Sequence, residues 1–489
     1  MRATSETDAQ VGDRANDPVR VTAKDVRAKA AGEGGNLGWT QAGRIEYARN
    51  GGRINTDFID NSAGVDTSDH EVNIKILLDA EVAAGRISEQ ERDELLPAMA
   101  DDVASLVLRH NHSQNLALAN ALSSDGPTAG VLEAWMCELE ESGHLDRAVD
   151  TMPSTTEMNR RMAAGERLAS PELCTLLAWT KIALCDAVLA TDLPEDPFVA
   201  DRLVGYFPPL LRERFTERMP THRLHREIIT TEAVNRFVDS QGITAYYRLH
   251  LQTGADIAQV IRCQLAARSV FGLGRVETDL THLGLDAVRT AKIRLALTDL
   301  AMHATRWFLN HGGADDIAGT IETYRPGVAT LVEKLSERLL GDSADAWQEK
   351  VDEVTELGLD RSDAAVVAAY DWSPVLLSIV EISEEGHPLD EVADAYLTLA
   401  RRVDMIRLTR LVEQLPQDRP TDARVRASLR EDLLRVMSDA TRRAVVIGTD
   451  NVLADGGRIV KSIAANPDLA HCVVMVSDLR SAVGQEVTL

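Results

Sequence analysis

From about residue 72 onward, apolar residues recur at steps of three and four. This spacing places them on one face of an α-helix, whereas a half-buried strand shows strict alternation. The clearest example is 172–190, with apolar side chains at Leu173, Leu176, Leu177, Leu184, Ala187 and Val188. Strand patterns are scarce, so the sequence predicts a large all-helical domain.

Helix starts and breaks favour the same fold. Ser88 with Glu91 forms a capping box, and Ser170 before Pro171 predicts an N-cap followed by a proline at the first helical position. Breaks rich in glycine, proline and aspartate lie at 123–130, 193–197, 311–315, 341–346 and 415–423. No fixed-period repeat connects the pieces, which disfavours a solenoid.

The first 78 residues differ from the rest because they contain two loops rich in glycine and asparagine, at 32–38 and 61–66. Glycine adopts positive φ and lets the backbone come close to a ligand. The first loop has the spacing G-x-G-x-x-x-G at Gly32, Gly34 and Gly38, a relative of the dinucleotide-binding motif. That motif follows a strand, and only one valine and three alanines precede it here, which disfavours this interpretation.

The second loop is followed by Ser68-Asp69-His70-Glu71, a capping box that predicts a helix beginning at Ser68. A helix N-terminus has unpaired amides and a partial positive charge, which suit a carboxylate or a phosphate. Ser68 therefore either caps the helix or binds a ligand, and the spacing alone favours the cap.

These segments resemble the end of the catalytic region of the very large NAD-dependent glutamate dehydrogenases, a bacterial class with a single long chain. The matching segments are VGDRANDPVRV (11–21), GEGGNLG (32–38), GRIEYA (43–48) and GGRINTDFIDNSAGVDTSDHEVNIKILL (51–78). The family's C-terminal region is matched by YFPPLLRERF (206–215), HRLHREIITTEAVNRFV (222–238) and ITAYYRLHLQTGADIAQVIRCQLAARSVF (243–271). The resemblance thus spans most of the chain.

The resemblance implies a mainly α-helical protein in two parts. Residues 1–75 would be a short α/β remnant of a Rossmann-like nucleotide-binding domain, and 76–489 a helical C-terminal domain. The implied cofactor is NAD, and the implied cofactor contacts are Gly34, Gly35, Asn36 and Asn61. The implied substrates are L-glutamate and 2-oxoglutarate. Ser68 would contact the side-chain carboxylate, which changes its interpretation from cap to ligand.

The resemblance also implies what this chain lacks. The family's catalytic lysine, catalytic aspartate and main nucleotide-binding glycine loop lie upstream of the matched region, and none of the eight lysines here sits in a glycine-rich loop. We therefore expect no catalytic residue in this chain, which would be the C-terminal part of the dehydrogenase and inactive alone. The alternative is a separate helical module for oligomer contacts or regulation. Ala30 and Ala31 replace the family's usual β-branched residues, and alanine is a poorer strand former.

Composition bears on compartment and partners. The chain has 77 acidic and 52 basic residues, a net charge of −25, which disfavours nucleic acid and anionic membranes as partners. No uninterrupted apolar run approaches the ~20 residues of a membrane span, and the N-terminus lacks a signal-peptide core. Five scattered cysteines without C-x-x-C spacing indicate reduced thiols. We expect a cytoplasmic protein, and the resemblance implies a homo-oligomer.

No metal ligand is predicted. His110 and His112 are two residues apart and point to different helix faces, while His222 and His225 lie among arginines. The acidic residues between 57 and 71 lack the ligand spacing of a calcium loop. Arg44 and Arg53 flank the two loops and either meet cofactor phosphate or substrate carboxylate, or neutralise these acids.

Overall fold

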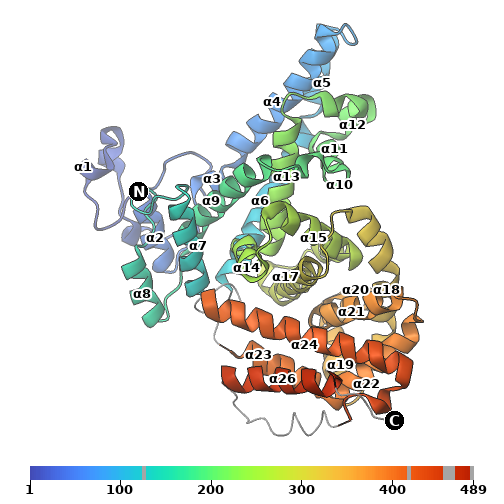
Figure 1. The fold of residues 1–489 in the computed structure, drawn as a ribbon. Helices are drawn as coiled ribbons and strands as arrows, with labels where there is room; N and C mark the ends of the chain where they lie inside the picture. The colour runs from blue at the N-terminus through green and yellow to red at the C-terminus, as the bar shows by residue number, and fades with distance from the viewer. Residues whose placement is uncertain (124–127, 416–419, 455–467, 485–489) are drawn as a thin grey trace. The chain divides into compact units, whose positions relative to one another are not determined.

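The computed structural model of this chain describes residues 1–123, 128–415, 420–454 and 468–484 (Figure 1). The chain divides into two compact units. The first unit is Met1–Ala245 and the second is Tyr246–Leu489. Two of the predicted breaks, 123–130 and 415–423, lie partly outside the described residues.

The described part of the first unit is built of α-helices and short 3₁₀ helices. They are α1 (Asp8–Val11), η1 (Arg14–Val19), η2 (Ala23–Asp25), α2 (Gln41–Arg49), α3 (Asp57–Asp60), α4 (Ser62–Ala83), α5 (Glu89–Ala98), α6 (Ala100–Leu122), α7 (Ala129–Glu141), α8 (Thr155–Ala163), α9 (Ser170–Leu189), η3 (Leu193–Glu195), α10 (Pro197–Ala200), α11 (Arg202–Tyr206), α12 (Pro209–Phe215), η4 (Thr216–Thr221) and α13 (His225–Gln241). Helix α6 packs against α4, α9 and α13, and α9 also packs against α13, so these four helices form the centre of the unit.

Helix α9 confirms the predicted helix at 172–190. Of its six predicted apolar core positions, all except Ala187 are buried. Its cap lies one residue earlier than predicted, because Ala169 is the N-cap and the Glu172 side chain accepts a hydrogen bond from the Ala169 amide. The predicted cap at Ser88 is confirmed, since its side chain accepts from the Glu91 amide.

The first sixty residues pack around a small hydrophobic cluster of Ala23, Trp39, Tyr47 and Ile54. The Tyr47 ring lies where a side chain on Gly52 would be, 2.3 Å from the position of an added Cβ, so this close approach requires glycine. No sheet is found in the described residues. Only the isolated bridges Arg2↔Thr22 and Ala30↔Arg53 occur, both parallel, so the predicted Rossmann-like remnant is not seen as an α/β layer.

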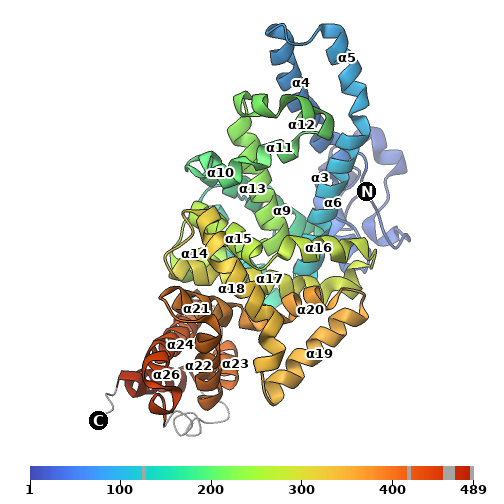
Figure 2. The ribbon, with the colours of Figure 1, turned by 90° about the vertical axis from the view of Figure 1, so that its right-hand side faces the viewer.

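The second unit is also helical in its described residues. Its elements are α14 (Ala245–Thr253, which begins at the unit boundary), α15 (Ile257–Val270), α16 (Leu273–His282), α17 (Ala287–Asn310), α18 (Ile317–Arg338), α19 (Asp342–Glu356), α20 (Arg361–Ala368), η5 (Ala369–Trp372), α21 (Ser373–Glu384), α22 (Leu389–Arg402), α23 (Met405–Glu413), α24 (Pro420–Ile447), η6 (Thr449–Asn451) and α26 (Leu469–Gly484). Helix α15 packs against α17 and α18, and α24 packs against α22 and α26 (Figure 2). The fold is therefore mainly α, as predicted.

One helical stretch, Arg361–Glu384, is long and apolar enough to cross a membrane by length and composition. Of its most apolar window, 61% is buried inside the protein, which is typical of a core helix. Its apolar character is therefore weak evidence for a membrane span.

Candidate functional site

The loop at 32–38 is held by a buried ion-pair network beneath it. Arg44, on α2, binds both carboxylate oxygens of Glu33, with Nε–Oε1 at 2.6 Å and Nη2–Oε2 at 3.0 Å, and its Nη2 lies 3.2 Å from Oδ1 of Asp57. Asp57 in turn accepts a hydrogen bond from the Leu37 amide at 2.8 Å. Burial alone would lower the pKa of Arg44, but its bonds to Glu33 and the charges of Glu33 and Asp57 outweigh burial and raise it. The loop thus has fixed ends and an exposed middle.

The two asparagines predicted as cofactor contacts meet at this loop. Asn61 Nδ2 donates to Asn36 Oδ1 at 2.8 Å, across an exposed surface between the loop and the start of α4. A side chain on Gly64 would lie 2.9 Å from the Asn61 amide group, so glycine there leaves room for it. The structure therefore brings together residues that are 25 positions apart.

The glycines of the loop do not have the backbone conformation that the sequence suggested. Gly34 and Gly35 have no positive φ, whereas Leu37 has φ of 62°. Nothing lies within 4 Å of a Cβ added to Gly34 or Gly35. Glycine at these two positions keeps the exposed surface open above the backbone, and the left-handed residue is one that the sequence analysis missed.

The predicted helix start at Ser68 is wrong. Helix α4 begins at Ser62, six residues earlier, so Ser68 lies inside the helix, and its Oγ donates to the Val65 carbonyl at 2.7 Å. The capping-box spacing is present in the sequence, but the amides it would cap are already bonded within the helix. Ser68 is exposed, so its hydroxyl is accessible and does not serve as an N-cap.

Several large apolar side chains close to these polar groups in the sequence are also exposed. Leu37 is 84% exposed, Val65 75%, Val72 51% and Phe58 50%. Val65, Ser68 and Val72 share one face of α4 because they are three and four residues apart. Exposed apolar side chains therefore flank Ser68 on this face of α4.

The two arginines differ in role. Arg44 neutralises acids, the second of its two predicted alternatives, since its guanidinium is buried against Glu33 and Asp57. Arg53 is exposed and makes no ion pair within 4.0 Å to any described residue. Its backbone forms the parallel bridge, with the Ala31 amide donating to the Arg53 carbonyl at 2.9 Å.

A cluster that the sequence analysis missed lies on the other side of α4. The side chains of Asp66 and His70 from α4 meet His110 from α6, with His110 Nδ1 at 3.1 Å from Asp66 Oδ2. Burial lowers the pKa of His70. Burial would lower the pKa of His110 as well, but its bond to Asp66 and the charges of Asp66 and Glu232 outweigh burial and raise it. Sequence spacing could not reveal this cluster because its members come from two helices.

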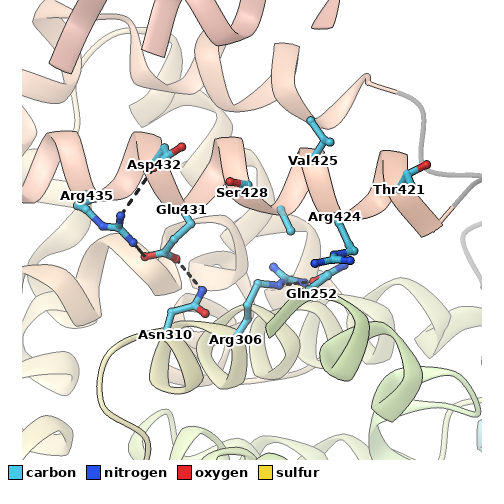
Figure 3. A pocket seen from close by; sticks show the side chains of 11 residues that line it. Gln252, Arg306, Asn310, Thr421, Arg424, Val425, Ser428, Glu431, Asp432 and Arg435 are labelled. Atoms are coloured by element: carbon cyan, nitrogen blue, oxygen red, sulfur yellow. Dashed lines mark hydrogen bonds and ion pairs between the residues drawn. The ribbon is translucent and has the colours of Figure 1, made fainter. Parts of the chain in front are cut away.

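A cavity of about 560 Å³ in the second unit lies among α14, α17 and α24 (Figure 3). Arg306 Nε donates to Gln252 at 2.6 Å, and Asn310 donates to Glu431 at 2.8 Å. Arg435 lies 3.8 Å from Glu431. No predicted site residue lines this cavity, and most of its charged groups bind one another, so we place the candidate site in the first unit.

The loop and its asparagine pair define the candidate site, and comparison with known proteins defines the class of protein. Residues 165–486 match the family model "Glutamate dehydrogenase, C-terminal", and residues 1–121 match "Bacterial NAD-glutamate dehydrogenase, catalytic domain". The chain therefore belongs to the bacterial NAD-glutamate dehydrogenase family, as its sequence resemblance implied.

Individual relatives carry the same name. The chain is 38% identical over 450 residues to the NAD-specific glutamate dehydrogenase of Mycobacterium tuberculosis, a match covering 92% of this chain and 28% of the relative. It is 36% identical over 501 residues to that of Pseudomonas aeruginosa, covering 100% and 30%. It is 35% identical over 455 residues to that of Halomonas elongata, covering 92% and 28%. The chain thus spans less than a third of the length of these curated relatives.

Proposed function

We propose that this chain is the C-terminal part of an NAD-dependent glutamate dehydrogenase, which interconverts L-glutamate, NAD and water with 2-oxoglutarate, ammonia, NADH and a proton. The relatives are named for this activity, and both family descriptions name the same enzyme. The observation that carries the proposal is the exposed pair Asn36–Asn61 above a rigidly held loop.

The paired amides fit the carboxamide of a nicotinamide. Their mutual bond uses Asn36 Oδ1 and Asn61 Nδ2. The Asn36 Nδ2 donors and the Asn61 Oδ1 acceptor have no protein partner among the described residues, and a carboxamide needs one acceptor and one donor opposite it. Gly34 and Gly35 add backbone that no side chain covers. The nicotinamide supplies the hydride-accepting ring when NAD is bound, and we propose these four residues orient it.

Ser68 is proposed to hold the side-chain carboxylate of glutamate or 2-oxoglutarate. Its exposed hydroxyl bonds a helix carbonyl as donor, which leaves its oxygen lone pairs and the option of turning the proton toward a carboxylate. Val65 and Val72, beside it on α4, would pack against the aliphatic part of the substrate. Ser68 would thus position the substrate and take no part in proton transfer.

The remaining chemistry is proposed to come from outside this chain. A basic group must polarise the 2-oxo acid and a carboxylate must move protons, whereas Arg44, Glu33 and Asp57 at this loop are buried and bound to one another. We propose that the parallel bridge Ala30↔Arg53 is the edge of a nucleotide-binding sheet that the upstream part completes. We propose residue 75 as the end of the nucleotide-binding part of this chain, although residue 75 lies within α4.

The isolated chain is proposed to be inactive, cytoplasmic, and part of a homo-oligomer in the complete enzyme. The alternative, a separate helical module for oligomer contacts or regulation, draws support from the size of the helical part, α4 to α26. The two proposed functions differ in what they require of the loop, because a helical module without catalysis would not need Asn36 to bind NAD.

Substitution of the asparagines in the complete enzyme, with the upstream catalytic part supplied, tests the proposal. Asn36→Ala or Asn61→Ala should raise the KM for NAD or lower kcat roughly tenfold. Each substitution removes one net hydrogen bond of about 1 kcal/mol, and it also leaves the other asparagine without the bond that orients its side chain. Asn50→Ala, an exposed asparagine at the end of α2, is the matched control and should leave kinetics unchanged. Unchanged NAD kinetics in both loop variants, with a lowered melting temperature, would assign the pair to turn structure alone.

A further inference from the structure

The side chains of Asp66, His70 and His110 form a cluster between α4 and α6. The proposed dehydrogenase chemistry does not use these three residues. We propose that Asp66, His70 and His110 bind a divalent transition-metal ion of the zinc class, which joins α4 to α6. This departs from the prediction, made from spacing, that no metal ligand is present. His110 on α6 lies 40 residues after His70 and 44 after Asp66 on α4, so no short sequence motif contains all three.

The geometry places three ligand atoms around one point. Asp66 and His70 are four residues apart on α4, so both side chains leave the same helix face. His70 Nε2 lies 3.9 Å from Asp66 Oδ1, and His110 Nδ1 lies 3.1 Å from Asp66 Oδ2. One ligand atom from each residue lies within 4.8 Å of the other two. In a tetrahedral zinc site with bonds of about 2.0–2.1 Å, the ligand atoms are about 3.3 Å apart. Small side-chain movements would therefore bring these three atoms to binding distance from one ion.

His70 is the observation that points to a ligand. Its side chain is 1% exposed, and neither ring nitrogen has a hydrogen-bond partner among the residues that the structure describes. A buried polar group without a partner costs free energy, so native proteins rarely leave one. His70 Nε2 is the nitrogen that faces Asp66. A metal ion bound there would give this nitrogen a bonding partner and would remove the free-energy cost of burying it without one.

The His70 ring is held in position by its neighbours. It stacks on Tyr206 of α11, with ring centroids 4.4 Å apart. The Tyr206 hydroxyl donates to Asp69 at 2.7 Å and accepts from Asn73 at 2.8 Å, so the tyrosine cannot turn away. A ligand whose orientation is fixed before binding loses less entropy when the metal binds.

The surroundings of His110 favour a cation. Glu232 of α13 lies 3.7 Å from His110 Nε2, the ring nitrogen opposite the proposed metal, where a carboxylate orients the imidazole of a metal-binding histidine. Asp69 adds another nearby carboxylate, and Arg109 is the opposing charge. Asp239, whose charge also interacts with His110, is already paired with Lys181 at 2.7 Å. The local excess of negative charge attracts a divalent ion.

The donor atoms narrow the class of metal. Two imidazole nitrogens and one carboxylate suit zinc and its neighbours cobalt and nickel, whereas magnesium and calcium prefer oxygen ligands alone. A water would supply a fourth ligand. We assign the ion a structural role, because it would link two helices of the four-helix centre of the unit.

Metal binding to the full chain tests this proposal directly. Wild-type protein, stripped with a chelator and dialysed against zinc, should retain about one ion more per chain than His70→Gln or His110→Gln. Cobalt should give the absorption bands of a tetrahedral site in the wild type and lose them in both variants. His112→Gln is the matched control, because His112 is exposed on the same helix α6 and should bind zinc like the wild type.

Two further variants separate binding from folding. Zinc should raise the Tm of the wild-type protein. Asp66→Asn keeps the size of the side chain and should lower zinc affinity and abolish this rise in Tm. Glu232→Gln should keep the ion but weaken its affinity about tenfold, since it removes only the orienting carboxylate. Equal zinc retention in the wild type, His70→Gln and His110→Gln, or no retention by folded wild type, would overturn the proposal and leave His110 and Asp66 as a simple ion pair.

Discussion

At the scale of single residues, the chain separates groups that hold the loop from groups exposed on it. Glu33, Arg44 and Asp57 are buried and bind one another, while Asn36 and Ser68 face outward. The resemblance to the glutamate dehydrogenase family predicted the exposed residues, because they lie in the matching sequence segments. The buried partners of Arg44 were not identifiable, because a sequence does not say which of several nearby acids an arginine reaches.

Ser68 gives a prediction that distinguishes a ligand from a cap. Because Ser68 lies within α4 and caps nothing, Ser68→Ala should leave the melting temperature close to that of the wild type. In the complete enzyme it should raise the KM for glutamate and 2-oxoglutarate roughly ten- to a hundredfold, as expected for a lost bond to a carboxylate of about 1.5–3 kcal/mol. Melting curves and Michaelis constants measure the two effects.

Ser105→Ala is the matched control for this variant. Ser105 is exposed within α6, and its Oγ also donates to a helix carbonyl, that of Asp101, at 2.9 Å. Its removal should change neither quantity. If Ser68→Ala leaves both substrate constants unchanged, Ser68 is only an exposed helix residue.

The ion pair beneath the loop gives a second prediction. Glu33→Ala would leave the buried Arg44 guanidinium with Asp57 as its one carboxylate partner among the described residues, and breaking a buried pair typically costs about 3–5 kcal/mol of stability. The partial pairing with Asp57 places our expectation at the lower end, about 3 kcal/mol. Denaturant unfolding of the chain measures it.

An exposed pair serves for comparison. Glu195→Ala removes the partner of Arg226, where the two side chains are 52% and 37% exposed, and should cost less than about 1 kcal/mol. Equal losses in the two variants would contradict the buried role assigned to Glu33.

At the scale of elements, helix identity was predictable and helix limits were less so. The apolar spacing of α9 identified its buried face, and the Ser88 cap is where the sequence placed it. The start of α4 was misplaced, because a capping-box pattern also occurs inside helices and α3 already directs the chain into α4 at Ser62. The strand expected before the loop is reduced to one bridge, since Ala30 and Ala31 favour strands weakly and the described residues offer one partner segment.

Contacts between helices also went unpredicted where the partners are far apart in sequence. His311, at the end of α17, lies 2.9 Å from Glu381 of α21 and 3.3 Å from Glu431 of α24. Glu381 also meets Arg442, and Glu431 meets Arg435. Burial alone would lower the pKa of His311, but its bonds to the two glutamates outweigh burial and raise it to about 9.

This shift predicts a pH dependence of stability for the second unit. An unfolded histidine has a pKa of about 6.5, so the contribution of His311 is fully present below that pH. It is lost as the pH rises toward 9, because the folded state then gives up its extra proton, with a total of about 3 kcal/mol at most. Denaturant unfolding at a series of pH values from 6 to 10 follows the loss.

His311→Gln should flatten this dependence between about pH 6.5 and 9, whereas the exposed His282→Gln should keep the wild-type profile. A wild-type profile in His311→Gln would show that the bonds to Glu381 and Glu431 contribute nothing to stability.

At the scale of the whole molecule, the chain carries the candidate site in its first unit and continues as helices through its second. Its two family matches, residues 1–121 and 165–486, follow one another along the sequence, and the whole spans less than a third of its relatives' length. The family was predictable from the segment at 51–78. The division into units at residue 245 was not, because no break in composition occurs inside the matched run 243–271.

The rate of glutamate-dependent NADH formation tests the central claim most directly. It should be measured for the chain alone, for the upstream catalytic part alone, and for the two combined. We expect turnover only in the combination, because the upstream part would supply the lysine and aspartate and this chain the loop with Asn36 and Asn61. Turnover by this chain alone, or an upstream part equally active without it, would contradict the account.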